Sequence, residues 1–468
     1  MLAQQIFKAN DIRGVTTGAT PEWDTAGAVA LGVAYARLMR HPDGSPVEFI
    51  AGRDMRVSGP ELSRAFVAGA RSEGARVIDA GLTSTDELWF VSGHLDLPGL
   101  TFTASHNPAR YNGVKFCRAG ARPVTPEFLT RLAADARAID AAGSAPDPTT
   151  PLDAPGPGSY RAEDFLARYA EHLHRLVPLE EIRRLKVVVD AGNGMAGHTA
   201  PSVLGPLGLD LHVLYGDLDG SFPNHEPNPL VPGNLVDAQR AVVETGADIG
   251  LVFDGDADRC FAIDETGAVV DPSAITAMIA VQELSREPGA TIVINTITSD
   301  SVPEIVAEHG GRTVVSRVGH TYVKALMAEH QAIFGGEHSA HYYFRDFYFA
   351  DTGMLAALHV LSRLGHADVP LSELTGRYQR RVASGEINSD VDDQQAAIDE
   401  VARAFAGRGD ARLGDGLTVR GDGWRFNLRP SNTEPLLRLN VEATGRAAME
   451  QTRDEVLSLV RSGSPAVH

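Results

Sequence analysis

The sequence predicts an α/β protein of three or four domains that closes with a smaller α+β domain. The chain has 468 residues, too many for a single hydrophobic core. Strand and helix patterns alternate from about residue 25 to residue 330, which is typical of mixed or parallel sheets covered by helices. From about Leu371 the pattern changes to closely spaced strands backed by helices, which favours an antiparallel α+β fold.

The first part of the chain leads to a candidate reactive serine. Helix patterns at 25–39 and 61–73 alternate with strand patterns at 47–51 and 77–80. The stretch 101–115 then places Ser105 three residues before Pro108. Because Pro108 biases the preceding residue away from helical geometry, we expect Ser105 on an irregular loop at a strand end, where open sheets carry their chemistry. An ordinary serine-rich turn is the alternative for this stretch alone.

Residues 140–159 are rich in Ala, Gly, Pro and Ser, and they predict a linker after the first domain. The later elements are expected as helices at 162–176, 273–285, 301–309, 320–330, 394–405 and 447–460, with strands at 186–190, 248–253, 291–295, 313–317, 417–420, 424–428 and 436–442. We therefore predict four domains, at residues 1–145, 157–258, 259–368 and 369–468.

A second chemical cluster follows the buried strand at 248–253. Asp254, Asp256 and Asp258 alternate along one loop, and carboxylate oxygens at this spacing are ligands that Mg²⁺ prefers. An EF-hand calcium loop would need glycine where Arg259 stands and helices on both sides, whereas the flanking residues predict strands. A solvated acidic turn is the remaining alternative, but three adjacent carboxylates repel one another unless a cation is present.

Charge and composition restrict the partners. The formal net charge of −19 argues against a nucleic-acid partner, although local arginines can still bind a small anion. The only cysteines, Cys117 and Cys260, provide no disulfide framework. The start of the chain lacks the pattern of a signal peptide, and no window approaches the roughly 18 apolar residues of a membrane span. We expect a cytoplasmic protein with no membrane partner, either monomer or dimer.

A candidate metal site, a loop serine and separate Arg/Ser/Thr loops together suggest phosphoryl transfer, in which a protein mainly positions groups and neutralises charge. Ser105 is not part of a Gly-x-Ser-x-Gly elbow, so a serine hydrolase is disfavoured. A Walker A sequence is also absent from the chain, which excludes an ordinary P-loop kinase.

Four motifs carry a resemblance to a known family. They are Thr103-Ala104-Ser105-His106-Asn107-Pro108, Asp254-Gly255-Asp256-Ala257-Asp258-Arg259, Gly336-Glu337-His338-Ser339-Ala340-His341 and Arg429-Pro430-Ser431-Asn432-Thr433-Glu434-Pro435. In kind and order they resemble the signatures of the α-D-phosphohexomutases, and they span nearly the whole chain. The third motif and the loop at 219–229 are similar to the phosphomannomutase/phosphoglucomutase branch.

The resemblance implies four domains around a central cleft and a reversible interconversion of hexose 1-phosphate and hexose 6-phosphate. Ser105 would be the phosphoserine that donates its phosphoryl group and takes one back from a hexose 1,6-bisphosphate intermediate. One Mg²⁺ ion would be held by Asp254, Asp256, Asp258 and an oxygen of the phosphorylated Ser105, with glucose 1,6-bisphosphate or a similar compound as activator.

The resemblance also implies roles for the remaining motif residues. Arg13 and Arg259 would steady the phosphoserine, and Lys115 and His320 are candidates for general acid and base, with His341 a weaker one. Glu337, Ser339 and His341 would contact the sugar. The non-reacting phosphate would be bound by Arg429, Ser431, Asn432, Thr433 and Arg438.

Alternatives remain open from the sequence. A phosphoglucosamine mutase is the nearest enzyme, although that branch usually has Gln where His338 stands. A sugar-phosphate phosphatase would discharge the phosphoserine to water, and a non-catalytic sensor would be expected to lack Ser105 or an aspartate. Asn10 and Ala340 depart from the usual tyrosine and glycine of the family, and neither change removes a catalytic group.

Overall fold

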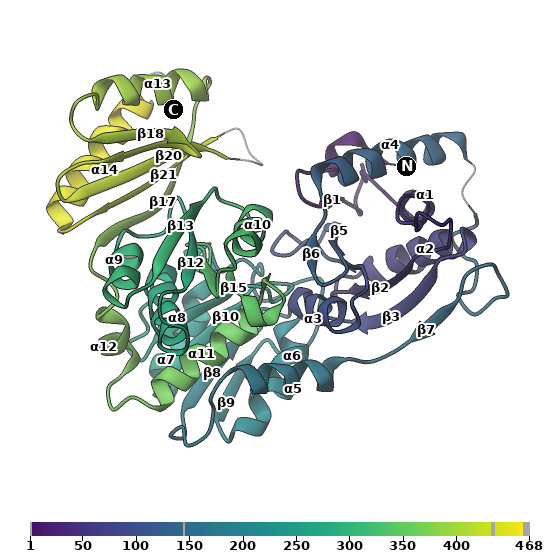
Figure 1. Ribbon diagram of the computed structural model, residues 1–468, viewed down its shortest axis with the longest axis horizontal. Coiled ribbons are helices and arrows are strands. Elements are labelled where there is room, and N and C mark those ends of the chain that lie inside the picture. The colour runs from purple at the N-terminus through teal and green to yellow at the C-terminus, as the bar shows by residue number, and fades with distance from the viewer. Residues whose placement is uncertain (1, 144–145, 432–435, 462–468) are drawn as a thin grey trace. The chain divides into compact units, whose positions relative to one another are not determined.

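The computed structural model describes residues 2–143, 146–431 and 436–461 (Figure 1). The chain forms two compact units, of which the first comprises Met1–Val270 and Ser339–Ser372 and the second comprises Asp271–His338 and Glu373–His468. None of the described helices combines the length and apolar character needed to cross a membrane.

The first sheet of the first unit is mixed, as predicted. Its strands in spatial order are β1 (Ile12–Val15), β5 (Tyr111–Arg118), β4 (Gly99–Phe102), β2 (Glu48–Arg53), β3 (Arg76–Leu82) and β7 (Tyr160–Ala162), with β6 (Arg122–Pro123) beside β5. β2 is parallel to β3 and β4, whereas β5 is antiparallel to β4 and β1. The register pairs Thr101 with Lys115 and Arg13 with Gly113, so both predicted cations lie on strands next to the Ser105 loop.

Four helices accompany this sheet: α1 (Thr25–Leu38), α2 (Gly59–Ser72), α3 (Thr85–Leu95) and α4 (Pro126–Ala142). α1, α2 and α4 contribute to one apolar core with β2 and β4, in which Tyr35, Phe49 and Phe66 pack ring to ring. Local sequence sets the helix ends. Asp24 and Ser84 cap the starts of α1 and α3 by accepting hydrogen bonds from backbone N–H groups.

The second sheet of this unit has the order β11 (Cys260–Asp264), β10 (Ile249–Phe253), β8 (Lys186–Asp190) and β9 (Asp210–Leu214). β8 is parallel to β9 and β10, and β10 and β11 form an antiparallel pair joined by the loop that carries the aspartates. Around it lie α5 (Leu166–Leu176), α6 (Ala196–Leu204), α7 (Val236–Thr245) and α11 (Gly353–Gly365). The unit also contains the antiparallel pair β15 (Tyr342–Phe344) and β16 (Ala350–Asp351).

The second unit begins with parallel strands. β12 (Thr291–Asn295) lies between β13 (Arg312–Ser316) and β14 (Phe334–Gly336), with α8 (Pro272–Arg286), α9 (Ser301–Glu308) and α10 (His320–His330). The chain passes from the first unit back to the second between Ser372 and Glu373, within α12 (Leu371–Gly376).

The C-terminal part confirms the predicted α+β domain. Its antiparallel sheet has the order β17 (Val382–Asp390), β21 (Leu436–Ala443), β20 (Trp424–Pro430), β19 (Gly416–Arg420) and β18 (Asp410–Gly414). α13 (Gln394–Ala404) and α14 (Arg446–Arg461) lie against this sheet (Figure 1). Apolar side chains of both helices form one core with those of the sheet.

Most predicted element ends shift by one or two residues in the structure, and two differences are larger. The helix expected from Ala162 begins at Leu166, because Tyr160–Ala162 pair with β3 as strand β7. The predicted linker starts later than expected, since α4 continues to Ala142 and ends on Gly143 in the left-handed conformation. Short 3₁₀ turns complete the described elements: η1 (Gln4–Ile6), η2 (Gly205–Leu207), η3 (Pro232–Leu235) and η4 (Arg345–Phe347).

Candidate active site

Ser105 lies on the irregular loop between β4 and β5 and is 4% exposed. Its backbone is in the left-handed region, with φ of 50°. For a residue other than glycine this conformation is uncommon, and the surrounding structure must hold it. Ser105 Oγ lies 3.0 Å from Asp254 Oδ2 and 3.1 Å from His106 Nδ1. The loop therefore presents the hydroxyl to the aspartate cluster of another sheet.

Asp254, Asp256 and Asp258 form a buried triad on the loop between β10 and β11. Each offers one carboxylate oxygen, and these oxygens lie within 4.8 Å of one another. Asp256 Oδ1 and Asp258 Oδ1 are buried and accept no hydrogen bond from the described residues. Buried carboxylate oxygens left without donors, on a hard-oxygen ligand set, fit a divalent cation such as Mg²⁺. The flanking strands also confirm that the loop is not an EF-hand.

Two buried cations neutralise part of this charge. Lys115 Nζ lies 2.6 Å from Asp256 Oδ2 and 2.7 Å from Asp258 Oδ2, and Arg259 Nη2 lies 2.8 Å from Asp254 Oδ2. Burial alone would lower the pKa of Lys115, but Asp256 and Asp258 raise it above its ordinary value. Lys115 is therefore a charged ammonium here, and it lies against two of the three aspartates.

The aspartates titrate differently. Burial, reinforced by Asp258 and Asp256 and opposed by Arg259, raises the pKa of Asp254 to about 7. Burial acts in the same direction on Asp256, but the charge and hydrogen bond of Lys115 hold its pKa below the ordinary value. The triad thus contains carboxylates of unequal basicity.

His341 lies at the edge of the same cluster. Its Nδ1 is 3.2 Å from Asp351 Oδ2 and 3.9 Å from Asp258 Oδ1, and a β-bridge joins it to Arg259. Asp351 is fully buried, and its carboxylate lies within ion-pair distance of the imidazole. Of the residues predicted to contact the sugar, His341 is the one that the structure brings beside the aspartates. Ser339 is partly exposed on the connection before it.

Arg13 reaches the Ser105 loop from β1. Its Nη1 donates to Asn107 Oδ1 at 2.8 Å, and its Nη2 pairs with Asp11 at 2.7 Å. The guanidinium therefore lies beside the Ser105 loop and contacts the side chain of Asn107, two positions after the serine.

In the second unit, Glu337 follows β14 and is almost fully buried. Its Oε2 accepts from Asn295 Nδ2 at 2.9 Å and from the backbone N–H of Gly319 at 3.2 Å. His320 is the next residue after Gly319 and begins α10. The structure thus brings the predicted sugar ligand Glu337 and the loop before His320 together.

Arg429 and Arg438 stand opposite each other on β20 and β21. Arg429 Nη2 lies 2.9 Å from Glu386 Oε2, and Arg438 Nη1 lies 3.1 Å from Glu386 Oε1. Two guanidinium groups converging on one carboxylate form a site whose geometry suits an anion. The backbone N–H of Ser431 donates to Leu436 O, while the predicted ligands Asn432 and Thr433 lie outside the described residues.

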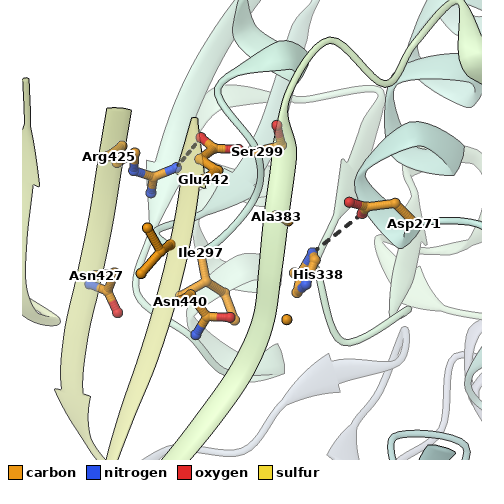
Figure 2. Close-up of a pocket in the computed structure, with 11 residues that line it drawn as sticks. Asp271, Ile297, Ser299, His338, Ala383, Arg425, Asn427, Asn440 and Glu442 are labelled. Carbon is orange, nitrogen blue, oxygen red and sulfur yellow. Dashed lines mark hydrogen bonds and ion pairs between the residues drawn. The ribbon is translucent and has the colours of Figure 1, made fainter. Parts of the chain in front are cut away.

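A small cavity of about 30 Å³ lies in the second unit between the C-terminal sheet and the loops after β12 and β14. Figure 2 shows the Arg425–Glu442 ion pair on one side and the His338–Asp271 pair on the other. Buried Asn427 Oδ1 also lines it without a hydrogen-bond donor among the described residues. At this volume the cavity has room for about one water molecule, which would satisfy such a group.

Several contributors were not predicted from the sequence. Thr85 at the start of α3 donates its hydroxyl to Asp256 Oδ2 at 2.6 Å, and His106 contacts the reactive hydroxyl. Loss of solvent and the charges of Arg259 and Arg13 lower the pKa of His106 well below its ordinary value. The contact of His106 could have been predicted, because His106 directly follows Ser105 in the sequence. No residue near Thr85 in the sequence indicates its contact with Asp256.

Comparison with known proteins agrees with this geometry. Four domain families described as phosphoglucomutase/phosphomannomutase match the chain: alpha/beta/alpha domain I at residues 4–142, domain II at 167–267, domain III at 271–381 and the C-terminal domain at 386–459. A protein of Xanthomonas campestris named "Phosphohexose mutases" is 39% identical over 98% of this chain and 99% of its own length. The chain belongs to the phosphoglucomutase/phosphomannomutase family.

Other relatives extend this result to the fold. A phosphomannomutase of Salmonella montevideo is 38% identical over 97% of this chain and 99% of its own length. The crystal structure of a phosphoglucomutase/phosphomannomutase family protein from Burkholderia thailandensis is 31% identical, covers 100% of this chain and 99% of its own, and superposes with a TM-score of 0.86. The predicted family and fold class are therefore confirmed.

Proposed function

We propose that the protein is a phosphomannomutase/phosphoglucomutase that reversibly converts hexose 1-phosphates and hexose 6-phosphates in the cytoplasm. One observation carries the proposal: Ser105 Oγ lies 3.0 Å from a triad of buried aspartates that is paired with two buried cations. A hydroxyl in such surroundings is suited to carrying a phosphoryl group, because the cations and a metal ion can spread the charge of transfer.

In the forward step, the bond between Ser105 Oγ and phosphorus breaks as a sugar hydroxyl forms a new bond to phosphorus. The hydroxyl proton passes to a base, and the Ser105 oxygen is released as an alkoxide that Lys115, already protonated, can neutralise. Mg²⁺ bound by Asp254, Asp256, Asp258 and the phosphoserine would supply positive charge to the transferring group. Reversal from the other end of the hexose 1,6-bisphosphate completes the interconversion.

The proposed substrate contacts divide between the two ends of the sugar phosphate. Arg259 and Arg13 steady the phosphoserine, His320 is the proposed partner of Lys115 in proton transfer, and glucose 1,6-bisphosphate is the proposed activator. The sugar hydroxyls are assigned to Glu337, Ser339 and His341. The non-reacting phosphate is assigned to Arg429, Ser431, Asn432, Thr433 and Arg438.

A coupled assay with Mg²⁺ and a trace of glucose 1,6-bisphosphate tests the function. It compares the 1-phosphates of mannose, glucose, glucosamine and N-acetylglucosamine, and records both 6-phosphate and free phosphate. We expect 6-phosphate from the mannose and glucose compounds. Selective conversion of the amino sugars would instead identify a phosphoglucosamine mutase, and free phosphate without isomer would identify a phosphatase.

A further inference from the structure

Arg56 is a fully buried arginine whose hydrogen bonds converge on the Ser105 loop. Its Nε donates to Asp54 Oδ2 at 3.2 Å, and its two terminal nitrogens donate to four main-chain carbonyl oxygens. These belong to Ser105 at 2.9 Å, Asn107 at 2.6 Å, Pro108 at 2.9 Å and Tyr111 at 2.9 Å. All five N–H groups of the guanidinium are thus used, three of them on the backbone of the Ser105 loop and one on the first residue of β5.

Two hydrogen bonds within the loop add to this support. Asn107 N donates to Ala104 O at 3.0 Å, and Ser105 N donates to Thr103 Oγ1 at 2.9 Å. The carbonyl of Ser105, which is in the left-handed conformation, accepts from Arg56 Nη2. A buried carbonyl needs a donor, and here the guanidinium supplies it at the residue whose side chain must face the aspartates.

Two neighbouring loops close over this arrangement. The ring of Phe222 lies 5.2 Å from the Arg56 guanidinium carbon, and a Cβ on Gly220 would come within 2.5 Å of Arg56 Cα. A Cβ on Gly255 would come within 2.5 Å of the Ser105 carbonyl oxygen. The guanidinium therefore has little freedom to move, and neither has the carbonyl that it holds.

We propose that Arg56 is a positioning residue for phosphoryl transfer, whose guanidinium fixes the backbone of Ser105 so that Oγ faces the metal-binding aspartates. Arg56 contacts backbone and Asp54 rather than any reacting atom. Lysine cannot replace it, because one ammonium has three donors and no planar fork to reach four carbonyls. This inference rests on the proposed role of Ser105.

The test compares Arg56→Lys and Arg56→Ala with a matched control, Arg71→Lys. Arg71 is also a buried arginine, and it donates to the backbone carbonyls of Ala154 and Gly158 in the same unit, away from the Ser105 loop. For Arg56→Lys we expect kcat to fall by about 10²-fold with KM within about two-fold, since misplacement of a reacting group acts on the chemical step. Arg71→Lys should lower the melting temperature while leaving kcat within about two-fold of the parent.

A second readout separates positioning from general stability. The rate at which glucose 1,6-bisphosphate phosphorylates Ser105 is followed by intact-protein mass spectrometry. Ethylguanidinium added to Arg56→Ala should restore this rate by about ten-fold or more, whereas ethylammonium, which lacks the planar fork, should not. If Arg56→Ala does not fold, Arg56→Lys still gives the kcat and phosphorylation measurements, because its stem and charge remain beside Asp54.

The outcomes are distinguishable. Near-normal turnover by Ser105→Ala would overturn the proposed function of the serine itself. An inactive Ser105→Ala together with a kcat and phosphorylation rate for Arg56→Lys equal to the parent would overturn the role of Arg56 alone. Equal losses of kcat and phosphorylation rate in Arg56→Lys and Arg71→Lys would also overturn the role of Arg56, because they would show that it contributes only to the stability of the fold.

Discussion

Gly255 lies between two of the aspartates, where the loop between β10 and β11 meets the Ser105 loop. A Cβ at this position would lie 2.5 Å from the Ser105 carbonyl oxygen, about 0.9 Å short of an ordinary contact of 3.4 Å. That oxygen is held by Arg56 and is not free to yield. Because backbone must move, we expect Gly255→Ala to displace Asp254 and Asp256 from Ser105 and to lower kcat by about 10²-fold, or about 2.7 kcal/mol of activation free energy.

The assay measures kcat at saturating glucose 1-phosphate and Mg²⁺, with thermal unfolding in parallel. Gly205→Ala is the matched control, since Gly205 has helical φ of −54° and a methyl group added there would meet no heavy atom of the described residues within 4 Å. This control should keep the parental kcat and gain slightly in stability. A kcat for Gly255→Ala within about two-fold of the parent would refute the reasoning that the two loops are in fixed contact.

Three further predictions follow from the first unit. Ser105→Ala should lower kcat by at least about 10³-fold while leaving the thermal unfolding curve near that of the parent, as measured by coupled assay and circular dichroism. Asp256→Asn should weaken Mg²⁺ binding by more than about ten-fold in titration calorimetry, because a charged ligand oxygen is lost. Burial alone would lower the pKa of His225, but its hydrogen bond to Asp190 raises the pKa above the ordinary value of 6.5. The pair therefore stabilises the folded state fully below pH 6.5. This stabilisation is lost as the pH rises through the folded-state pKa. The deficit in stability of His225→Asn should therefore be larger near about pH 5.5 than near about pH 8, by under about 1 kcal/mol, and an equal deficit at both would contradict the assignment.

The sequence predicted the parts of the site that are local in the chain. Asp254, Asp256 and Asp258 share one loop, and their spacing alone indicates a ligand set. Ser105 was recognisable from its turn-forming neighbours and from the motif around it. Strand and helix alternation was likewise enough to predict mixed α/β sheets and a closing α+β domain.

Contacts made at long range could not be predicted in this way. Arg56 and Ser105 are separated by 49 positions, and Thr85 and Asp256 by 171. Their meeting depends on the strand order and on β5 inserting antiparallel between β1 and β4, which periodicity does not specify. A buried arginine that serves backbone carbonyls also resembles a surface cation when only its neighbours in sequence are seen.

Charge balance explains why an acidic chain can carry an anionic group at Ser105. Three buried carboxylates oppose two buried cations, Lys115 and Arg259, so the cluster has an excess of one negative charge when all five groups are ionised. A phosphoryl group on Ser105 would add nearly two more, which such a site cannot hold in a low-dielectric interior without a divalent cation. The serine and the triad would therefore act as one electrostatic unit, in which a phosphoryl group and a metal ion would each make the binding of the other favourable. The overall charge of −19 is compatible with this chemistry, because the cations are concentrated at the points where phosphate must be held.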